Sequence, residues 1–254
     1  MKYFAEPGSL IRQIWGKADT ILFIFAGAAA EFALNKAVDW LYFTGKLPAD
    51  PIGRLFSTVV YAKKIIFSTE EEAVKAIDKI AAIHAGVEKS RGASIPDWAY
   101  RDVLFMLVHY SISAFELLER KLNTQEKQSV YDVFYRVGTR MGLKDIPKDY
   151  QSWLPSREAH LHSDLARSNF THDLFKQYKK HLGGFRYRIL IESQKLVVPQ
   201  RVSALLGFKN FKAVAPLIPI YQVSKKVGMD VVIKFILLPP KYREEIKALD
   251  IKDI

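Results

Sequence analysis

The chain has 254 residues, of which 49% are hydrophobic and 26% charged, and it contains no cysteine. This length suffices for a well-packed domain, and the lack of cysteine excludes disulfides, cysteine zinc sites, iron–sulfur clusters and thiolate-bound haem. The net charge is +11, and residues 171–254 carry 16 lysines and arginines against 7 acidic residues. Because apolar stretches such as ILIESQKLVVP separate these basic residues, we expect no nucleic acid as partner. Solubility is the simplest explanation of the charge, and peripheral contact with an anionic membrane is the next.

The first residues and the most apolar stretch bear on localisation. No apolar run precedes Pro7, so no secretory signal peptide is predicted. The stretch TILFIFAGAAAEFAL, residues 20–34, contains Glu31 and is too short to span a bilayer. We therefore expect a buried helix over residues 20–34, and a cytoplasmic protein that is at most peripheral to a membrane.

Start signals typical of helices recur along the chain. Asp50 followed by Pro51 predicts a helix that begins at Pro51, with Asp50 as its N-cap. Residues 68–90 are expected to form the next helix, because two overlapping capping boxes stand at their start. These boxes pair Ser68 with Glu71 and Thr69 with Glu72.

The remaining segments also favour helices. Residues 97–122 are too apolar for a surface helix, so we expect them at the centre of the fold. A capping box of Asn123 and Glu126 opens a further helix, which Gly142 should end. The later helical segments are punctuated by Gly183–Gly184, Pro199, Pro216, Pro219 and Pro239–Pro240. Since no segment alternates with a period of two, we predict an all-α fold in which residues 1–254 form a single domain.

One imidazole, that of His84, interrupts the apolar face of the helix expected over residues 68–90. The apolar positions of this face are Ala73, Ile77, Ile80, Ala81 and Val87. Their helical spacing turns His84 toward the interior. A histidine in such a place is more often a core residue satisfied by a neighbour than a ligand of a metal or cofactor. Both interpretations stay open on the residues alone.

Several segments, taken in order, carry a resemblance to a known family. They are EPGSLIRQIWGKADTILFIFAGAAAEF, DPIGRLFST, IAAIHAGVEKSRG, VLFMLVHYSISAF, VYDVFYRVGTRMGLKDIPKDY and LLPPKYREEI. Together they resemble the haem-dependent oxygenases that include latex-clearing protein (rubber oxygenase) and MpaB. The resemblance implies many helices that enclose a haem b pocket. It also implies an oxygenase, or a related oxidoreductase, that acts on a hydrophobic substrate with dioxygen.

The same resemblance implies that His84, in the segment IHAGV, is the proximal ligand of the haem iron. A neutral imidazole on an apolar helix face can bind haem iron while its other nitrogen donates to a carbonyl or carboxylate. The neighbours Ala81, Ala85 and Gly86 are small enough for a flat macrocycle to approach the helix. With the resemblance, the ligand becomes the preferred interpretation of His84, and dioxygen is expected on the opposite side of the haem.

For that opposite, distal side the resemblance implies a role for Arg54 and Thr58, in the segment RLFST. Their spacing of four places both on one helix face, where they can pair with a haem propionate, an oxygen species or water. Ser57 stands where latex-clearing proteins can have a lysine that caps the iron, so a lysine-capped state is not expected. For the family's catalytic carboxylate, Asp39 is the nearest candidate and Glu31 the second. Neither match is strong enough to assign a polyisoprene substrate.

His109, in the segment FMLVHYS, is the rival of His84 as axial ligand, although packing near the pocket or orienting another group is its preferred role. A further cluster, in HLHSDLARSNFTH, consists of His160, His162, Asp164 and His172. In a helix, His160 and His162 point to different faces, so we interpret this segment as polar surface and not as a metal site.

The sequence lacks the motifs that are typical of several other enzyme classes. The segment HLGGFRYR has neither the strand nor the lysine of a phosphate-binding loop, and the chain contains neither Gly-x-Ser-x-Gly nor His-Glu-x-x-His. Two alternatives to the oxygenase stay open. One is a non-enzymatic haem- or lipid-binding helical module at a membrane surface, and the other is a membrane-surface helical protein without a cofactor. The sequence predicts neither the substrate nor the oligomeric state.

Overall fold

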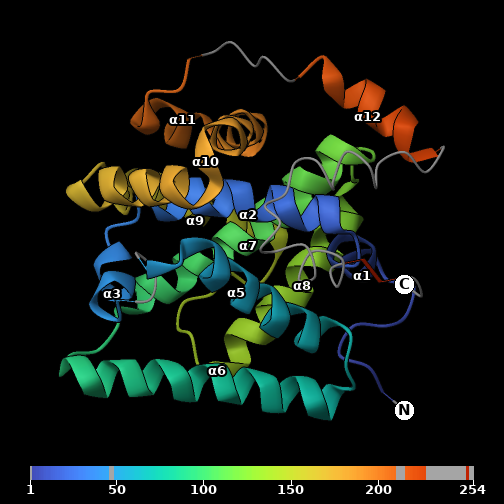
Figure 1. Cartoon of the computed structure of the whole chain (residues 1–254). Coiled ribbons are helices and arrows are strands. Elements are labelled where there is room, and N and C mark those ends of the chain that lie inside the picture. Colours follow the sequence, from blue (N-terminus) through green and yellow to red (C-terminus); the bar gives the residue numbers. More distant parts are fainter. Residues whose placement is uncertain (1, 46–48, 210–214, 227–249, 252–254) are drawn as a thin grey trace.

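Helices make up nearly all of the regular structure (Figure 1). The computed structural model describes residues 2–45, 49–209, 215–226 and 250–251. The helices are α1 (Leu10–Trp15), α2 (Ala18–Phe32), α3 (Val38–Phe43), α5 (Pro51–Ile66), α6 (Glu70–Arg91), α7 (Asp97–Leu118), α8 (Thr124–Arg140), α9 (Tyr150–Ser163), α10 (Asn169–Val197), α11 (Gln200–Leu206) and α12 (Leu217–Lys226). Within the described residues, extended pairing is limited to the isolated bridges Tyr3–Thr69 and Asn35–Leu165. The predicted all-α fold is therefore confirmed.

The central pair of helices is α2 and α7, which pack on each other more extensively than any other described pair. Both are rich in fully buried side chains, as expected for residues 20–34 and 97–122. The two helices cross closely at Gly27, where an added Cβ would stand 2.2 Å from two ring carbons of Tyr110. Since real atoms do not approach so closely, this crossing requires glycine.

No helix in the described part of the chain combines the length and the hydropathy needed to cross a bilayer. Helix α2 is the most apolar stretch, yet it carries the fully buried Glu31 and lies within the protein. The expectation that this stretch is a core helix is confirmed.

Capping side chains begin several helices where the sequence predicts. Asp50 accepts a hydrogen bond from the backbone N–H of Gly53 at 3.0 Å, and Pro51 is the first residue of α5. Of the two overlapping capping boxes at the start of α6, only that of Thr69 and Glu72 forms. One helix has one N-cap residue, so the box of Ser68 could not form as well. The capping box of Asn123 and Glu126 opens α8, as predicted.

The observed C-terminal ends of α7 and α8 differ from the predicted ones. Helix α7 ends at Leu118, where 122 was expected, because Glu119 leaves the helical conformation with φ −121° and ψ −83°. Helix α8 ends at Arg140, shortly before Gly142, which adopts a φ of 77°. Such positive φ values favour glycine, so Gly142 takes the turn that follows the helix.

The glycines and prolines that separate the later helical segments have different structural effects. Gly183 has φ 73° and ψ 167°, a non-helical conformation that divides α10 into two helical segments joined at a kink. Pro199 precedes α11 as its N-cap residue, and Pro219 lies in the first turn of α12, where its missing N–H costs no helical hydrogen bond. Pro216 immediately precedes α12, whereas Pro239–Pro240 lie outside the described residues.

Helix α6 runs along one edge of the protein, with α5 and α8 packed on it (Figure 1). Its first half is well packed, since Ala73, Ala76 and Ile77 are fully buried. In its second half, residues 78–91, no side chain is fully buried by the described part of the chain. His84 lies in this less covered half.

Candidate functional site

His84 faces the protein from the second half of α6. Its ring is half-buried and packs edge-on against the ring of Tyr100, with 5.2 Å between the ring centroids. The Nδ1 atom is buried and has no hydrogen-bond partner among the described residues. Buried polar atoms of structural side chains are normally hydrogen-bonded. The imidazole of His84 therefore differs from that of a satisfied core histidine.

The three small neighbours of His84 lie on different sides of α6. Ala81 is half-buried, on the same side as His84, whereas Ala85 and Gly86 are exposed. Ile83, beside them, exposes 46% of its surface. Of the three small residues, only Ala81 therefore leaves room beside the imidazole on the inner side of the helix.

Arg54 and Thr58 lie one turn apart on α5, as predicted, and their side chains are in contact. Nη1 of Arg54 donates to Oγ1 of Thr58 at 3.2 Å and to Oγ of Ser57 at 3.0 Å. Burial lowers the pKa of Arg54. Within the described ranges, no carboxylate lies at ion-pair distance from this guanidinium. A partly buried cation without an anion is unfavourable, so this position can attract an acidic ligand group.

The packing of α5 against α6 brings Arg54 into electrostatic range of His84. Burial lowers the pKa of His84, the positive charge of Arg54 lowers it further, and Glu88 opposes both effects. The two larger effects favour the neutral form of the imidazole, which is the form that binds a metal. The structure brings together the two residues that the sequence assigns to opposite sides of a cofactor.

The two candidate carboxylates are both engaged in ion pairs. Asp39, on α3, contacts Nη2 of Arg91 at 2.5 Å, and the Arg91 guanidinium stacks 4.0 Å from the ring of Trp40. Arg91 is the last residue of α6, so Asp39 is tied to the helix that carries His84. Glu31 lies elsewhere, in the core between α2, α7 and α9.

His109 occupies a different environment from that of His84. Its Nε2 atom lies 3.3 Å from Oγ of Ser113, and its side chain also hydrogen-bonds the backbone of Val197 on α10. Burial is the main cause that lowers its pKa to about 4. His109 and Ser113 line a hollow of about 230 Å³ beside Val197. Since its polar groups are partnered, His109 resembles a satisfied structural histidine more than His84 does.

A buried ionic network joins α2, α7 and α9. Arg157 donates through both terminal nitrogens to the carboxylate of Glu31, with both distances 2.5 Å. The hydroxyl of Tyr110 donates to the same carboxylate at 2.7 Å, and Nε2 of His160 lies 3.0 Å from it. Burial alone would raise the pKa of Glu31, but Arg157 and His160 hold it well below its usual range.

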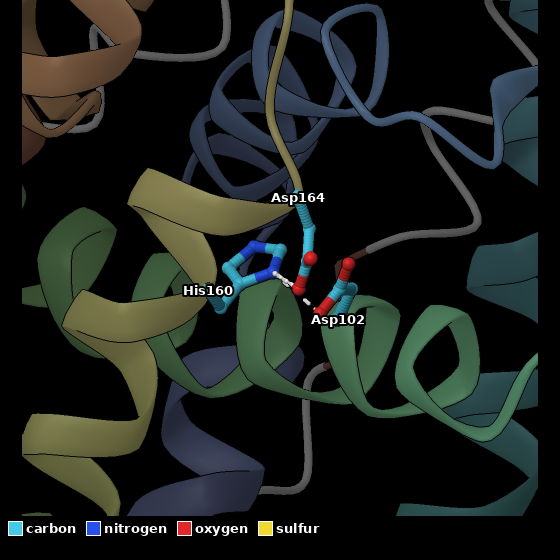
Figure 2. A group of neighbouring side chains, drawn as sticks. All are labelled: Asp102, His160 and Asp164. Carbon is cyan, nitrogen blue, oxygen red and sulfur yellow. Dashed lines mark ion pairs between the residues drawn. The ribbon is translucent and has the colours of Figure 1, made fainter.

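The network continues from His160 to two aspartates (Figure 2). Nδ1 of His160 lies against Oδ1 of Asp102 on α7 and 3.5 Å from Oδ2 of Asp164. Nδ2 of Asn35 donates to the other oxygen of Asp102 at 2.8 Å. Burial alone would lower the pKa of His160, but its contacts with Asp102 and Glu31 outweigh this effect and raise the pKa to about 9.

This network corrects one sequence-based expectation. His160 and His162 do point to different faces of α9, but His160 exposes only 4% of its surface, so interpreting it as polar surface was wrong. His162 and His172 are exposed, as expected, whereas Asp164 is half-buried. The signal that could have found the inner face of α9 is the helical spacing of Trp153, Arg157, His160, Leu161 and Asp164.

In the part of the chain that the structure describes, these features define an all-helical protein. The Nδ1 atom of one imidazole lacks a hydrogen-bond partner there, and a guanidinium without a carboxylate partner lies nearby. The family model described as "ER-bound oxygenase mpaB/B'/Rubber oxygenase, catalytic domain" matches residues 13–247. Because the match covers most of the chain, the protein belongs to this family and is an oxygenase. The resemblance predicted from the sequence motifs is confirmed.

Membership in an oxygenase family indicates a metal or haem cofactor and dioxygen as a substrate. No curated protein and no solved structure shows a significant match to the chain.

Proposed function

We propose that this protein is a haem b-dependent oxygenase that acts on a hydrophobic substrate, with His84 as the ligand of the haem iron. The observation that carries the proposal is that His84 on α6 lies within electrostatic range of Arg54 on α5. Among the described residues, Nδ1 of His84 has no hydrogen-bond partner, and the guanidinium of Arg54 has no carboxylate partner. These two groups match what haem requires, namely a donor for iron and a cation for an acidic group.

The residues around His84 and Arg54 also suit the binding of a haem group. The second half of α6 is incompletely covered by the described residues, and the aromatic ring of Tyr100 supports one face of the imidazole. The buried Nδ1 of His84 lacks a protein partner, and Ala81 leaves room beside the ring. When bound, haem supplies the oxygen-activating chemistry, and the protein supplies binding, orientation and polarity.

Within this proposal each residue of the site has a defined task. Arg54 binds an acidic group of the cofactor or orients an oxygen species, and Thr58 supplies the adjacent hydroxyl. Asp39 is the proposed carboxylate base, held in place by Arg91 at the end of the helix that carries His84. His109 packs and orients groups near the pocket, since its own polar atoms have protein partners.

Replacing His84 by alanine should abolish the Soret band of the protein purified after haem supplementation, because the iron then has no protein ligand. His109→Ala, at the competing histidine, should keep a band of wild-type position. The measurement is the visible spectrum, with haem quantified per chain. Circular dichroism of both variants checks that the helices persist. Retention of a wild-type band by His84→Ala, with loss in His109→Ala, would show that the ligand is His109.

Replacing Arg54 by alanine should accelerate haem loss to a scavenging apoprotein at least about tenfold. A charge-assisted hydrogen bond contributes roughly 1.5–3 kcal/mol, and 1.4 kcal/mol corresponds to a factor of ten. Thr58→Val keeps the side-chain shape, so it should leave haem content unchanged but alter the dissociation constant of cyanide. Arg140→Ala, at an exposed arginine of α8, serves as the control. Wild-type haem loss and cyanide binding in both site variants would contradict the distal assignment.

The family description and the charge of residues 171–254 support a second part of the proposal, namely peripheral contact with an anionic membrane on its cytoplasmic side. Clustered lysines and arginines are attracted to anionic lipid within about a Debye length. The protein should therefore sediment with vesicles that contain phosphatidylserine and not with neutral phosphatidylcholine vesicles. Equal binding to both vesicle types would contradict an electrostatic contact.

A further inference from the structure

The side chains of Asp102, His160 and Asp164 converge on one point between α7 and the C-terminal end of α9 (Figure 2). Each offers one atom that is a common metal ligand, and the three atoms lie within 4.8 Å of one another. We propose that these three residues form a binding site for a divalent transition-metal cation, distinct from the proposed haem site on α6.

The first observation behind this proposal concerns the imidazole of His160. This side chain is 3% exposed, and its Nδ1 atom points at both aspartates without making a hydrogen bond of normal geometry to either. A cation ligated by the imidazole and the two carboxylates needs donor atoms about 3.0–3.4 Å apart, given bonds of about 2.1 Å. The Nδ1–Asp164 distance of 3.5 Å is close to this spacing, whereas Oδ1 of Asp102 lies closer to Nδ1 and has to move outward when an ion binds.

Two of the three proposed ligands have hydrogen-bond partners behind them. Nε2 of His160 lies 3.0 Å from Oε1 of Glu31, so Nδ1 is the ring nitrogen that faces the two aspartates. The amide of Asn35 holds the second oxygen of Asp102 at 2.8 Å. Metal-binding histidines almost always pass their other ring nitrogen to a carboxylate, carbonyl or water, and ligating carboxylates are themselves hydrogen-bonded. Glu31 and Asn35 therefore orient two of the three proposed ligands, His160 and Asp102, as the outer partners of a metal centre do.

The charge balance of the cluster also favours a divalent ion. Three carboxylates, those of Glu31, Asp102 and Asp164, face one permanent cation, Arg157. The three carboxylates outnumber this cation by two negative charges, which is the charge that one divalent cation brings. Asp164 exposes 22% of its side chain, so it offers an entry path for the ion and space for a water ligand. One imidazole and two carboxylates favour Zn²⁺, Mn²⁺, Fe²⁺ or Co²⁺ over Mg²⁺ and Ca²⁺.

The test is titration of the EDTA-treated, full-length protein with Zn²⁺ by calorimetry, in buffer that contains excess Mg²⁺. We expect one saturable site per chain. Asp164→Asn should weaken its affinity at least about tenfold, because even an outer partner of a metal ligand contributes that much. His162→Ala is the matched control, since His162 lies on the same helix but is exposed and paired with Glu158. His84→Ala should bind Zn²⁺ as the wild type does, which separates this site from the proposed haem site.

X-ray absorption of the Zn²⁺-loaded wild type provides a second readout that does not depend on any variant being folded. One imidazole with oxygen donors is the expected coordination. Two or more imidazoles would indicate ions held by surface histidines and would overturn the proposal. So would the absence of a saturable site in the wild type, or unchanged affinity in Asp164→Asn, and the cluster would then be an ion-pair network alone.

Discussion

Replacing Arg157 by methionine is expected to lower the free energy of unfolding by about 3–5 kcal/mol, because the variant deprives a buried carboxylate of its main cationic partner. Glu31 is completely buried, and both of its oxygens accept hydrogen bonds from Arg157. Methionine approximates the volume of the arginine stem but offers no donor. Urea-induced unfolding, followed by circular dichroism near neutral pH, measures the loss.

The control is an exposed pair of the same geometry. Arg140 contacts both oxygens of Asp78, and both side chains are about half exposed. Water solvates these groups when the pair is broken, so Arg140→Met should cost less than about 1 kcal/mol. Combining Arg157→Met with Glu31→Gln should recover part of the loss, because the uncompensated charge is then removed. Equal costs for Arg157→Met and Arg140→Met would contradict a buried network.

Replacing Gly27 by alanine is expected to destabilise the protein by about 2–3 kcal/mol through overpacking. The new Cβ would stand 2.2 Å from two ring carbons of Tyr110, so one of the two central helices must shift. The ring cannot readily yield, because it is fully buried and its hydroxyl is hydrogen-bonded to Glu31. Thermal and urea unfolding of the variant measure this effect.

Gly86→Ala is the matched control, since this glycine also lies inside a helix but has no atom within 4 Å of an added Cβ. At Gly86 the substitution raises helix propensity without a steric clash, so we expect it to stabilise the protein by about 0.5–1 kcal/mol. If both alanine variants stabilised the protein, the close crossing of α2 and α7 would not exist in solution.

The sequence alone predicted the features that depend on neighbours along the chain. Asp50, Thr69 and Asn123 begin helices because an N-cap side chain needs only the backbone two or three residues ahead. The inward direction of His84 and the shared face of Arg54 and Thr58 follow from the helical repeat in the same way. The order of the sequence motifs also predicted the family, and membership in this family implies an oxygenase.

Only the tertiary structure decided which distant side chains meet. The sequence makes Glu31 the second candidate for a catalytic carboxylate and predicts His160 at the surface. The fold instead places both in one buried network with Arg157 and Asp102. These residues come from three helices, and their contacts depend on how α2, α7 and α9 cross. Crossings are decided by packing over whole helix faces, and no local pattern specifies them. The burial of His160, and the metal site that we infer from it, therefore became apparent only from the assembled fold.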